Sequence, residues 1–435
     1  MIISNRKVIK NASWIIICKI VQSLLAFVIG MFSARYLGPS NYGLITYASS
    51  IVAFAVPLAE LGLRNVLVEE IISHPDHEGK ILGTSLVMSL MTSLVCIVGC
   101  VVFVSIVNAN EKDTLIVCAL YSISLIFQSM EIIQYWYQAK LLSKYTSVAS
   151  LFAYFIVSIY KIFLLVTQKS VYWFAVSYTL DYLIISITLI FLYQQLSKQK
   201  LSFSFSLSRK LFSRSKYYII SNMMVTMFSQ TDKVMIKMML GNAENGYYST
   251  AITIAGISSF IFSALIDSLR PVIFVNRKVS QKKFEKSMSL LYSIIIYLGL
   301  AQSIFITLSA DLIISIIYGE AYMEAIPILK IITWYSAFSY MGSVRNIWIL
   351  AEEKQRYLWI INLSGAILNV LGNFILIPIM GSSGAAIASV FTQFFTNFLL
   401  CFIIKPIRDI IKIIWVSLNP KFLIQILIQK ETKYV

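Results

Sequence analysis

The sequence predicts an all-α polytopic membrane protein of about twelve transmembrane helices, and two features of its composition support this prediction. Hydrophobic residues make up 58% of the 435 residues and charged residues only 13%, with a mean hydropathy of +0.78. Soluble domains are roughly half apolar and a quarter charged. Long apolar segments in lipid must satisfy their own backbone amides, as helices do, and the short alternating segments of a membrane β-barrel are absent from the sequence.

Apolar segments of about 20 residues, enough for one crossing, define the predicted helices. They lie near 12–34, 44–66, 82–107, 114–137, 147–166, 171–193, 217–240, 247–269, 289–309, 323–344, 358–379 and 383–404. The first follows a basic N-terminus and lacks a small-residue cleavage site, so we expect it to be retained. Residues 409–435 are predicted to form an amphipathic tail in the inner headgroup region, because Pro420 interrupts any thirteenth crossing.

Lysine and arginine concentrate in alternate loops, which predicts that both termini are cytoplasmic in a plasma-membrane protein. The net charge of +16 is then explained by loops that face anionic membrane lipids, and no nucleic-acid partner is expected. The five cysteines lie in apolar segments without a CxxC pair, and His74 and His77 lie in a polar loop. We therefore expect neither disulfides nor a metal site.

A short motif occurs twice, after the first and after the seventh predicted helix. LGPSNYG (37–43) corresponds to LGNAENG (240–246). The match predicts two six-helix bundles, residues 1–200 and 201–408, joined by the basic, serine-rich segment 194–215. Six helices is an even number, so the bundles are expected to share one orientation, related by a parallel pseudo-twofold along the membrane normal, with a substrate site between them.

Ionisable residues inside the predicted helices are candidate functional residues, because a charge at the bilayer centre costs at least about 3 kcal/mol. The cations are Lys19, Arg35, Lys233, Lys237 and Lys330, and the acids are Glu131, Asp181 and Asp232. Snorkelling to the interface is the alternative for Arg35 and Lys237. Asp232 is either a counter-ion to a neighbouring lysine or part of a proton or sodium site.

Two further patterns have both structural and functional interpretations. The repeated pairs Glu60 with Arg64 and Asp267 with Arg270 are about one helical turn apart and read as structural ion pairs or as gate latches. A polar stripe in the fourth helix, from Gln128 to Gln138, lines either a cavity or a hydrogen-bonded helix contact.

Five segments in order along the chain resemble a known family. They are ARYLGPSNYGLITYA (34–48), SQTDKVMIKMMLGNAENGYYSTA (229–251), YGEAYMEAIPIL (318–329), LAEEKQRYL (350–358) and GAAIASVFTQF (384–394). This pattern resembles the polysaccharide flippases of the multidrug and oligosaccharidyl-lipid exporter superfamily.

The resemblance implies two bundles that open alternately to either membrane face, with a polar, often cationic cavity between them. The expected substrate is an undecaprenyl-pyrophosphate-linked oligosaccharide for O-antigen or capsule assembly. Lys19, Arg35, Lys233 and Lys237 have the charge that such a headgroup requires. The expected partners are membrane lipids and other polysaccharide-assembly proteins, with no cofactor beyond a proton or sodium gradient.

Three other functions fit parts of the pattern. A cation-coupled multidrug exporter shares the architecture, a membrane polymerase or ligase would act on the same lipid-linked sugars, and a scaffold would not need intramembrane charges. The predicted outer loops are short for a catalytic surface, and no nucleotide-binding loop or nucleophile elbow is present in the sequence. The sequence therefore predicts a transporter rather than an enzyme.

Overall fold

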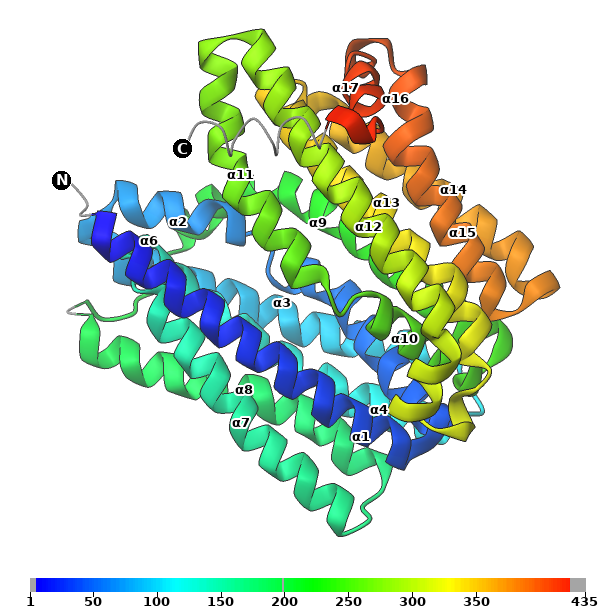
Figure 1. Ribbon diagram of the computed structural model, residues 1–435. Helices are drawn as coiled ribbons and strands as arrows, with labels where there is room; N and C mark the ends of the chain where they lie inside the picture. The colour runs from blue at the N-terminus through cyan, green and yellow to red at the C-terminus, as the bar shows by residue number, and fades with distance from the viewer. Residues whose placement is uncertain (1–4, 198, 423–435) are drawn as a thin grey trace. The chain divides into compact units, whose positions relative to one another are not determined.

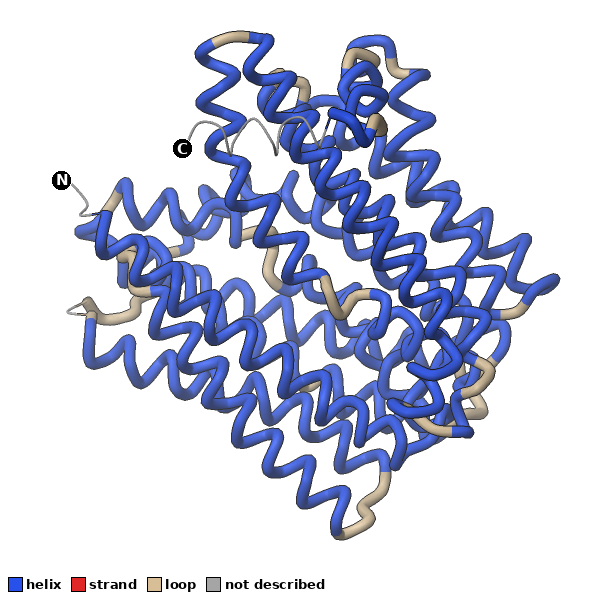
Figure 2. The backbone as a smooth tube through the Cα atoms, in the orientation of Figure 1, coloured by secondary structure: helices blue, strands red, loops and turns tan. Residues whose placement is uncertain are grey.

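The computed structural model describes residues 5–197 and 199–422, and every regular element in these residues is a helix (Figure 2). Contacts divide the chain into an N-terminal unit, Met1–Gln230, and a C-terminal unit, Thr231–Val435. The boundary falls inside the long helix α9, Phe205–Leu240. The sequence-based limits at 200/201 and 408/409 remain a prediction.

The N-terminal unit consists of nine α-helical segments or parts of them, in the colours from blue to green in Figure 1. They are α1 (Asn5–Ala59), α2 (Arg64–Ser73), α3 (Glu78–Val107), α4 (Lys112–Ser122), α5 (Ser124–Met130), α6 (Gln134–Ala139), α7 (Ser143–Val166), α8 (Val171–Leu196) and the first part of α9, with the 3₁₀ turns η1 (Pro75–His77) and η2 (Glu131–Ile133).

The C-terminal unit continues from the end of α9 with helices coloured green to red. They are α10 (Asn242–Ala255), α11 (Ser259–Val279), α12 (Gln281–Ile317), α13 (Ala325–Ala351), α14 (Leu358–Met380), α15 (Ser382–Phe394), α16 (Leu400–Ile403) and α17 (Ile410–Ser417), with the 3₁₀ turns η3 (Glu320–Tyr322), η4 (Gln355–Tyr357) and η6 (Lys405–Ile407) and the π-helical segment η5 (Phe395–Leu399).

The repeated motif forms the same backbone corner in both units. Gly38 has φ 71° and ψ 170°, and Gly241 has φ 99° and ψ −176°. Only glycine adopts this region readily, because a Cβ atom would be strained there. At both places the glycine joins two membrane helices, so the repeat seen in the sequence is a repeat of the helix–turn–helix geometry.

Nine helical stretches within the described residues are long and apolar enough to cross a membrane. The stretch Ile17–Ala59 covers most of the first two predicted crossings, 12–34 and 44–66, which are joined through the kink at Gly38. The seventh and tenth predicted helices are present as α9 and α13, but they are too polar to be counted among these nine stretches. The protein is a multi-pass membrane protein, as predicted.

The eighth and the second predicted helices change direction within their predicted bounds. The eighth, 247–269, is broken between α10 and α11 at Gly256–Ser258. The second, 44–66, ends at Ala59, because Leu61 and Gly62 have φ values of 52° and 64°. The break at Gly256–Ser258 follows a mostly apolar run, whereas the break at Leu61–Gly62 lies between Glu60 and Arg64. Hydrophobicity alone reveals a change of backbone direction in neither place.

The segment between α8 and α9 lies against α3 as an extended strap. Ser202 N donates to Gly79 O (3.3 Å), Gly79 N donates to Gln199 Oε1 (3.0 Å), and Ser204 N donates to Thr84 Oγ1 (3.1 Å). A Cβ atom at Gly79 would lie 2.4 Å from the carbonyl oxygen of Lys200. Within the predicted linker 194–215, the described loop residues lie only between Leu196, where α8 ends, and Phe205, where α9 begins.

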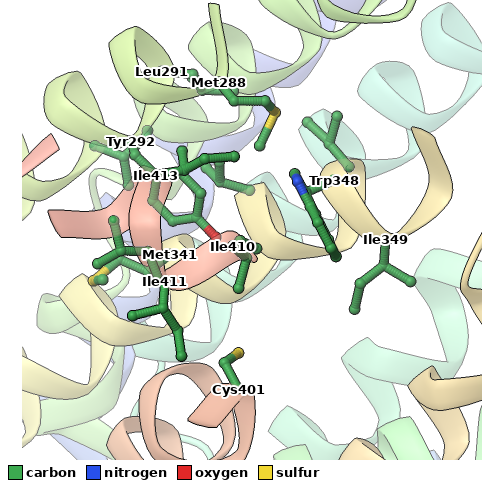
Figure 3. Close-up of a cluster of buried hydrophobic side chains, with 14 of the residues drawn as sticks. Met288, Leu291, Tyr292, Met341, Trp348, Ile349, Cys401, Ile410, Ile411 and Ile413 are labelled. Carbon is green, nitrogen blue, oxygen red and sulfur yellow. The ribbon is translucent and has the colours of Figure 1, made fainter. Parts of the chain in front are cut away.

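The C-terminal tail begins as a helix that packs into the C-terminal unit. Ile410, Ile413 and Ile414 of α17 are buried with Met288, Leu291 and Trp348 in one apolar cluster (Figure 3). Ser293 Oγ donates to Ser417 O (2.9 Å). An eight-residue helix rises only about 12 Å, so α17 does not cross a membrane. The rest of the predicted amphipathic tail, 423–435, lies outside the described residues.

Candidate functional site

Asp232 is the centre of a buried polar cluster in the C-terminal unit. Its side chain, on α9, is 6% exposed. The carboxylate accepts hydrogen bonds from Tyr248 Oη on α10, from Asn373 Nδ2 on α14 at 2.7 Å and from Ser389 Oγ on α15. Four helices therefore converge on one carboxylate through neutral donors.

A second layer of polar side chains surrounds these donors. Asn369 Nδ2 donates to Ser389 Oγ (3.0 Å), and Asn373 Nδ2 lies 3.4 Å from Asn369 Oδ1. Asn373 Oδ1 is buried without a hydrogen-bond partner. Carboxylate, amide and hydroxyl oxygens are the ligands that hard cations prefer. No group of three or more His, Cys, Asp or Glu side chains suited to a metal occurs in the described residues.

The two lysines predicted to accompany Asp232 lie on the same helix. Lys233 is partly buried, and Lys237, one turn further, is 3% exposed. Lys233 interacts electrostatically with Asp232, and the hydrogen bonds described above reach the carboxylate from uncharged groups. The carboxylate therefore combines neutral hydrogen-bond donors with a neighbouring cation.

Lys19 is exposed on α1 in the N-terminal unit, at a groove that Gln22 also lines. Arg35 is exposed on the same helix, just before the Gly38 corner. Sixteen residues separate Lys19 from Arg35, which corresponds to about 24 Å of helix. One diphosphate therefore cannot contact both cations at the same time.

The two candidate acids of the N-terminal unit lie inside it and share a polar environment. Asp181 on α8 is partly buried and interacts electrostatically with Lys161 on α7. Its Oδ1 atom is buried without a hydrogen-bond partner. Glu131 is partly buried in η2, where the fourth predicted helix is interrupted.

The polar stripe of the fourth predicted helix divides into two parts. Gln128 is buried and donates from Nε2 to Ser124 Oγ (3.0 Å), and Tyr135 is 5% exposed. Gln134 and Gln138, by contrast, line the groove that contains Lys19. The Gln128 bond lies within α5, so it is not a contact between helices, and only Gln134 and Gln138 match one of the two interpretations, that of a cavity lining.

Lys330 and the two predicted gate pairs differ in whether they form ion pairs. Lys330 on α13 forms an ion pair with Asp311 on α12 (2.8 Å). Arg270 and Asp267 form an exposed pair on α11 (3.4 Å). Arg64 is exposed and makes no salt bridge with Glu60 in the described part of the chain. The two pairs related by the repeat thus differ in their contacts.

Among the described residues, the buried charged residues that the sequence did not single out are Glu70, Glu78 and Arg345. Glu70, 2% exposed, accepts hydrogen bonds from Lys210 and Arg214 of α9. Arg345 follows the end of the tenth predicted helix, 323–344, which is wrong as a helix boundary: Arg345 lies in α13, is 4% exposed, and donates to Thr396 O and Asn397 Oδ1, each at 2.7 Å. The only available sequence signal was the polar run around each residue.

Comparisons with known proteins agree over most of the chain. A sequence profile of the family described as "Polysaccharide biosynthesis protein" matches residues 8–277. The capsular polysaccharide biosynthesis protein CapF of Staphylococcus aureus is 21% identical and covers 89% of this chain and 96% of its own. An uncharacterized membrane protein of Methanocaldococcus jannaschii is 24% identical and covers 90% of this chain and 82% of its own.

Solved structures share the fold at low sequence identity. The inward closed conformation of the lipid II flippase MurJ is 16% identical, covers 95% of both chains and superposes with a TM-score of 0.72. An inward-facing multidrug resistance transporter of the MATE family, from the MOP superfamily, is 16% identical, covers 89% of this chain and 96% of its own, and has a TM-score of 0.65. Both neighbours are membrane transport proteins.

Proposed function

The chain belongs to the polysaccharide biosynthesis protein family, and from this premise we propose that it is a flippase for a lipid-linked oligosaccharide used in surface polysaccharide assembly. The whole-length likeness to the lipid II flippase fold carries the proposal, because an oligosaccharide on a diphosphate lipid poses the same physical problem. The charged headgroup needs a polar path while the lipid tail stays in hydrocarbon.

The proposed substrate is an oligosaccharide repeat unit on undecaprenyl pyrophosphate, and the proposed mechanism is alternating access. Lys19, Lys233 and Lys237 supply cations for the diphosphate, with Arg35, just before the Gly38 corner of α1, as a separate contact. The protein is proposed to reside in the plasma membrane with both termini cytoplasmic. An inside-negative potential then favours outward movement of the headgroup by about 2.3 kcal/mol per charge per 100 mV.

Asp232 is the proposed coupling residue for a proton or sodium gradient. Its support is the buried set of oxygens around it, including the unpartnered Asn373 Oδ1. Asp181 and Glu131 are proposed as a second, protonatable group in the N-terminal unit.

Complementation of a flippase-null strain tests the function. Wild-type protein is expected to restore surface polymer and to remove accumulated lipid-linked repeat units. At matched membrane expression, Lys19→Ala and Lys233→Ala are expected to leave the repeat units on the inner leaflet, whereas Lys282→Ala, on an exposed part of α12, is expected to behave as wild type.

A cation-coupled multidrug exporter is the second candidate, because the MATE fold matches with a TM-score of 0.65. Wild-type protein that exports cationic dyes, and restores no polymer in strains with several different repeat units, would replace the flippase proposal with this one.

A further inference from the structure

The groove beside Lys19 has an unusual lining for a membrane helix bundle. Its volume is about 290 Å³. It lies between α1, α6 and α7, within the N-terminal unit. Lys19 is the single charged residue of its lining, and no carboxylate contributes.

This volume lies just below the range of about 300–1,000 Å³ that is typical of small-molecule sites. It is large enough for one sugar with its phosphate, but not for a whole oligosaccharide.

The polar groups of the groove lack protein partners. Among the side chains that the structure describes (14–15, 17–64, 66–197 and 199–422), none forms a hydrogen bond with the amides of Gln22, Gln134 or Gln138, or a salt bridge with Lys19. In membrane bundles such groups usually pair across helices. Their partner here is therefore water or a ligand.

The hydroxyl groups at the start of α7 add acceptors to the same groove. Thr146 Oγ1 and Ser147 Oγ donate to Ser143 O at 2.8 and 3.1 Å. Each hydroxyl donates its proton to the backbone, so its lone pairs remain available to accept a hydrogen bond. The groove thus offers one ammonium, three amides and several acceptors.

This combination suits a phosphate ester that also carries hydroxyl groups. An ammonium group binds phosphate as a point charge, and the absence of a carboxylate from the lining avoids repulsion of the anion. Amides both donate to and accept from hydroxyl groups. Glycosyl phosphates and the glycerol phosphate of a phospholipid headgroup share this chemistry.

We propose that the groove binds the sugar phosphate nearest the lipid, with the phosphate at Lys19 and the sugar hydroxyls at Gln22, Gln134 and Gln138. The proposal rests on the proposed function and adds a site that distinguishes one proximal sugar from another. Since the lining includes three glutamines, their pattern of donors and acceptors is the feature that selects the sugar.

Binding to the purified, full-length protein in detergent tests the proposal, with native mass spectrometry as the measurement. The probes are geranyl diphosphate linked to N-acetylglucosamine or to galactose, and phosphatidylglycerol. At least one sugar probe is expected to bind more tightly than phosphatidylglycerol. Lys19→Met is expected to raise its Kd by about tenfold or more, and Gln134→Leu or Gln138→Leu by about two- to tenfold each.

Matched variants separate the groove from general charge and folding effects. Lys144→Met removes a cation that lies over the Trp14 ring (4.9 Å), outside the groove lining, and Gln195→Leu changes an exposed glutamine of α8. Both are expected to keep the wild-type Kd. Gln134→Glu keeps the size and polarity of the side chain but adds a charge that repels phosphate, and it is expected to weaken binding even if Gln134→Leu does not fold.

Three outcomes would overturn the proposal. They are wild-type protein that binds neither sugar probe, phosphatidylglycerol that binds as tightly and with the same dependence on the groove, and groove variants that all keep the wild-type Kd. If the wild type still complements the flippase-null strain, the proposed function stands without this site. Groove-dependent sugar binding without complementation would instead remove the flippase function and leave the site.

Discussion

In the C-terminal unit Asp232 is enclosed by donors from three other helices, whereas in the N-terminal unit Lys19 and its neighbouring glutamines lie open to a groove. The first centre satisfies its own hydrogen bonds, apart from Asn373 Oδ1. The second leaves most of its polar groups to water or a ligand. A satisfied cluster is suited to a proton or a small ion, and an open one to a larger polar molecule.

The largest expected difference between the two centres is in the loss of stability when the central residue is replaced. Asp232→Leu leaves the buried Tyr248 and Ser389 hydroxyl groups without this acceptor, at a cost of about 1–3 kcal/mol each, and leaves Asn373 Nδ2 with only the 3.4 Å contact to Asn369 Oδ1. Lys19→Leu removes a group without a protein partner and is expected to change the free energy of unfolding by about 0.5 kcal/mol or less. Thermal unfolding of both variants in detergent measures the difference. Equal losses of stability would contradict the comparison.

A smaller and equal effect is expected at the two repeated corners. Gly38→Ala and Gly241→Ala each force a Cβ atom into a backbone region that costs about 1–3 kcal/mol. No heavy atom lies within 4 Å of the added Cβ at either position, so conformation alone sets the cost. The measurement is the melting temperature of each variant, with Gly99→Ala, a helical position that is also open, as the control. A loss at only one corner would show that the repeat is not energetically symmetric.

The smallest effect is expected at Lys330. Its partner Asp311 is exposed, and exposed ion pairs contribute little to stability. Lys330→Met is therefore expected to leave the melting temperature and the complementation of a flippase-null strain unchanged. Loss of transport at normal expression would return Lys330 to the substrate path, where the sequence analysis placed it.

The internal repeat is a feature of the fold that could be predicted from the sequence. The motif at Leu37 and Leu240 predicted two similar halves, and the matching glycine corners agree with it. The break between α10 and α11 was not predictable in the same way, because Gly256 lies in an apolar run that could also continue a helix. Arg345 was misplaced for a related reason: its partners, Thr396 and Asn397, lie about fifty residues away.

The sequence by itself determined the fold class, the membrane location and the repeat, because hydrophobicity and local motifs act over short stretches of chain. It also identified Asp232, Lys19 and the glutamine stripe as residues that lipid would not tolerate without a reason. Only the tertiary structure decided which of them are satisfied and which are open. Hydrogen bonds between distant helices depend on packing, and no local pattern encodes the partner that packing brings into reach.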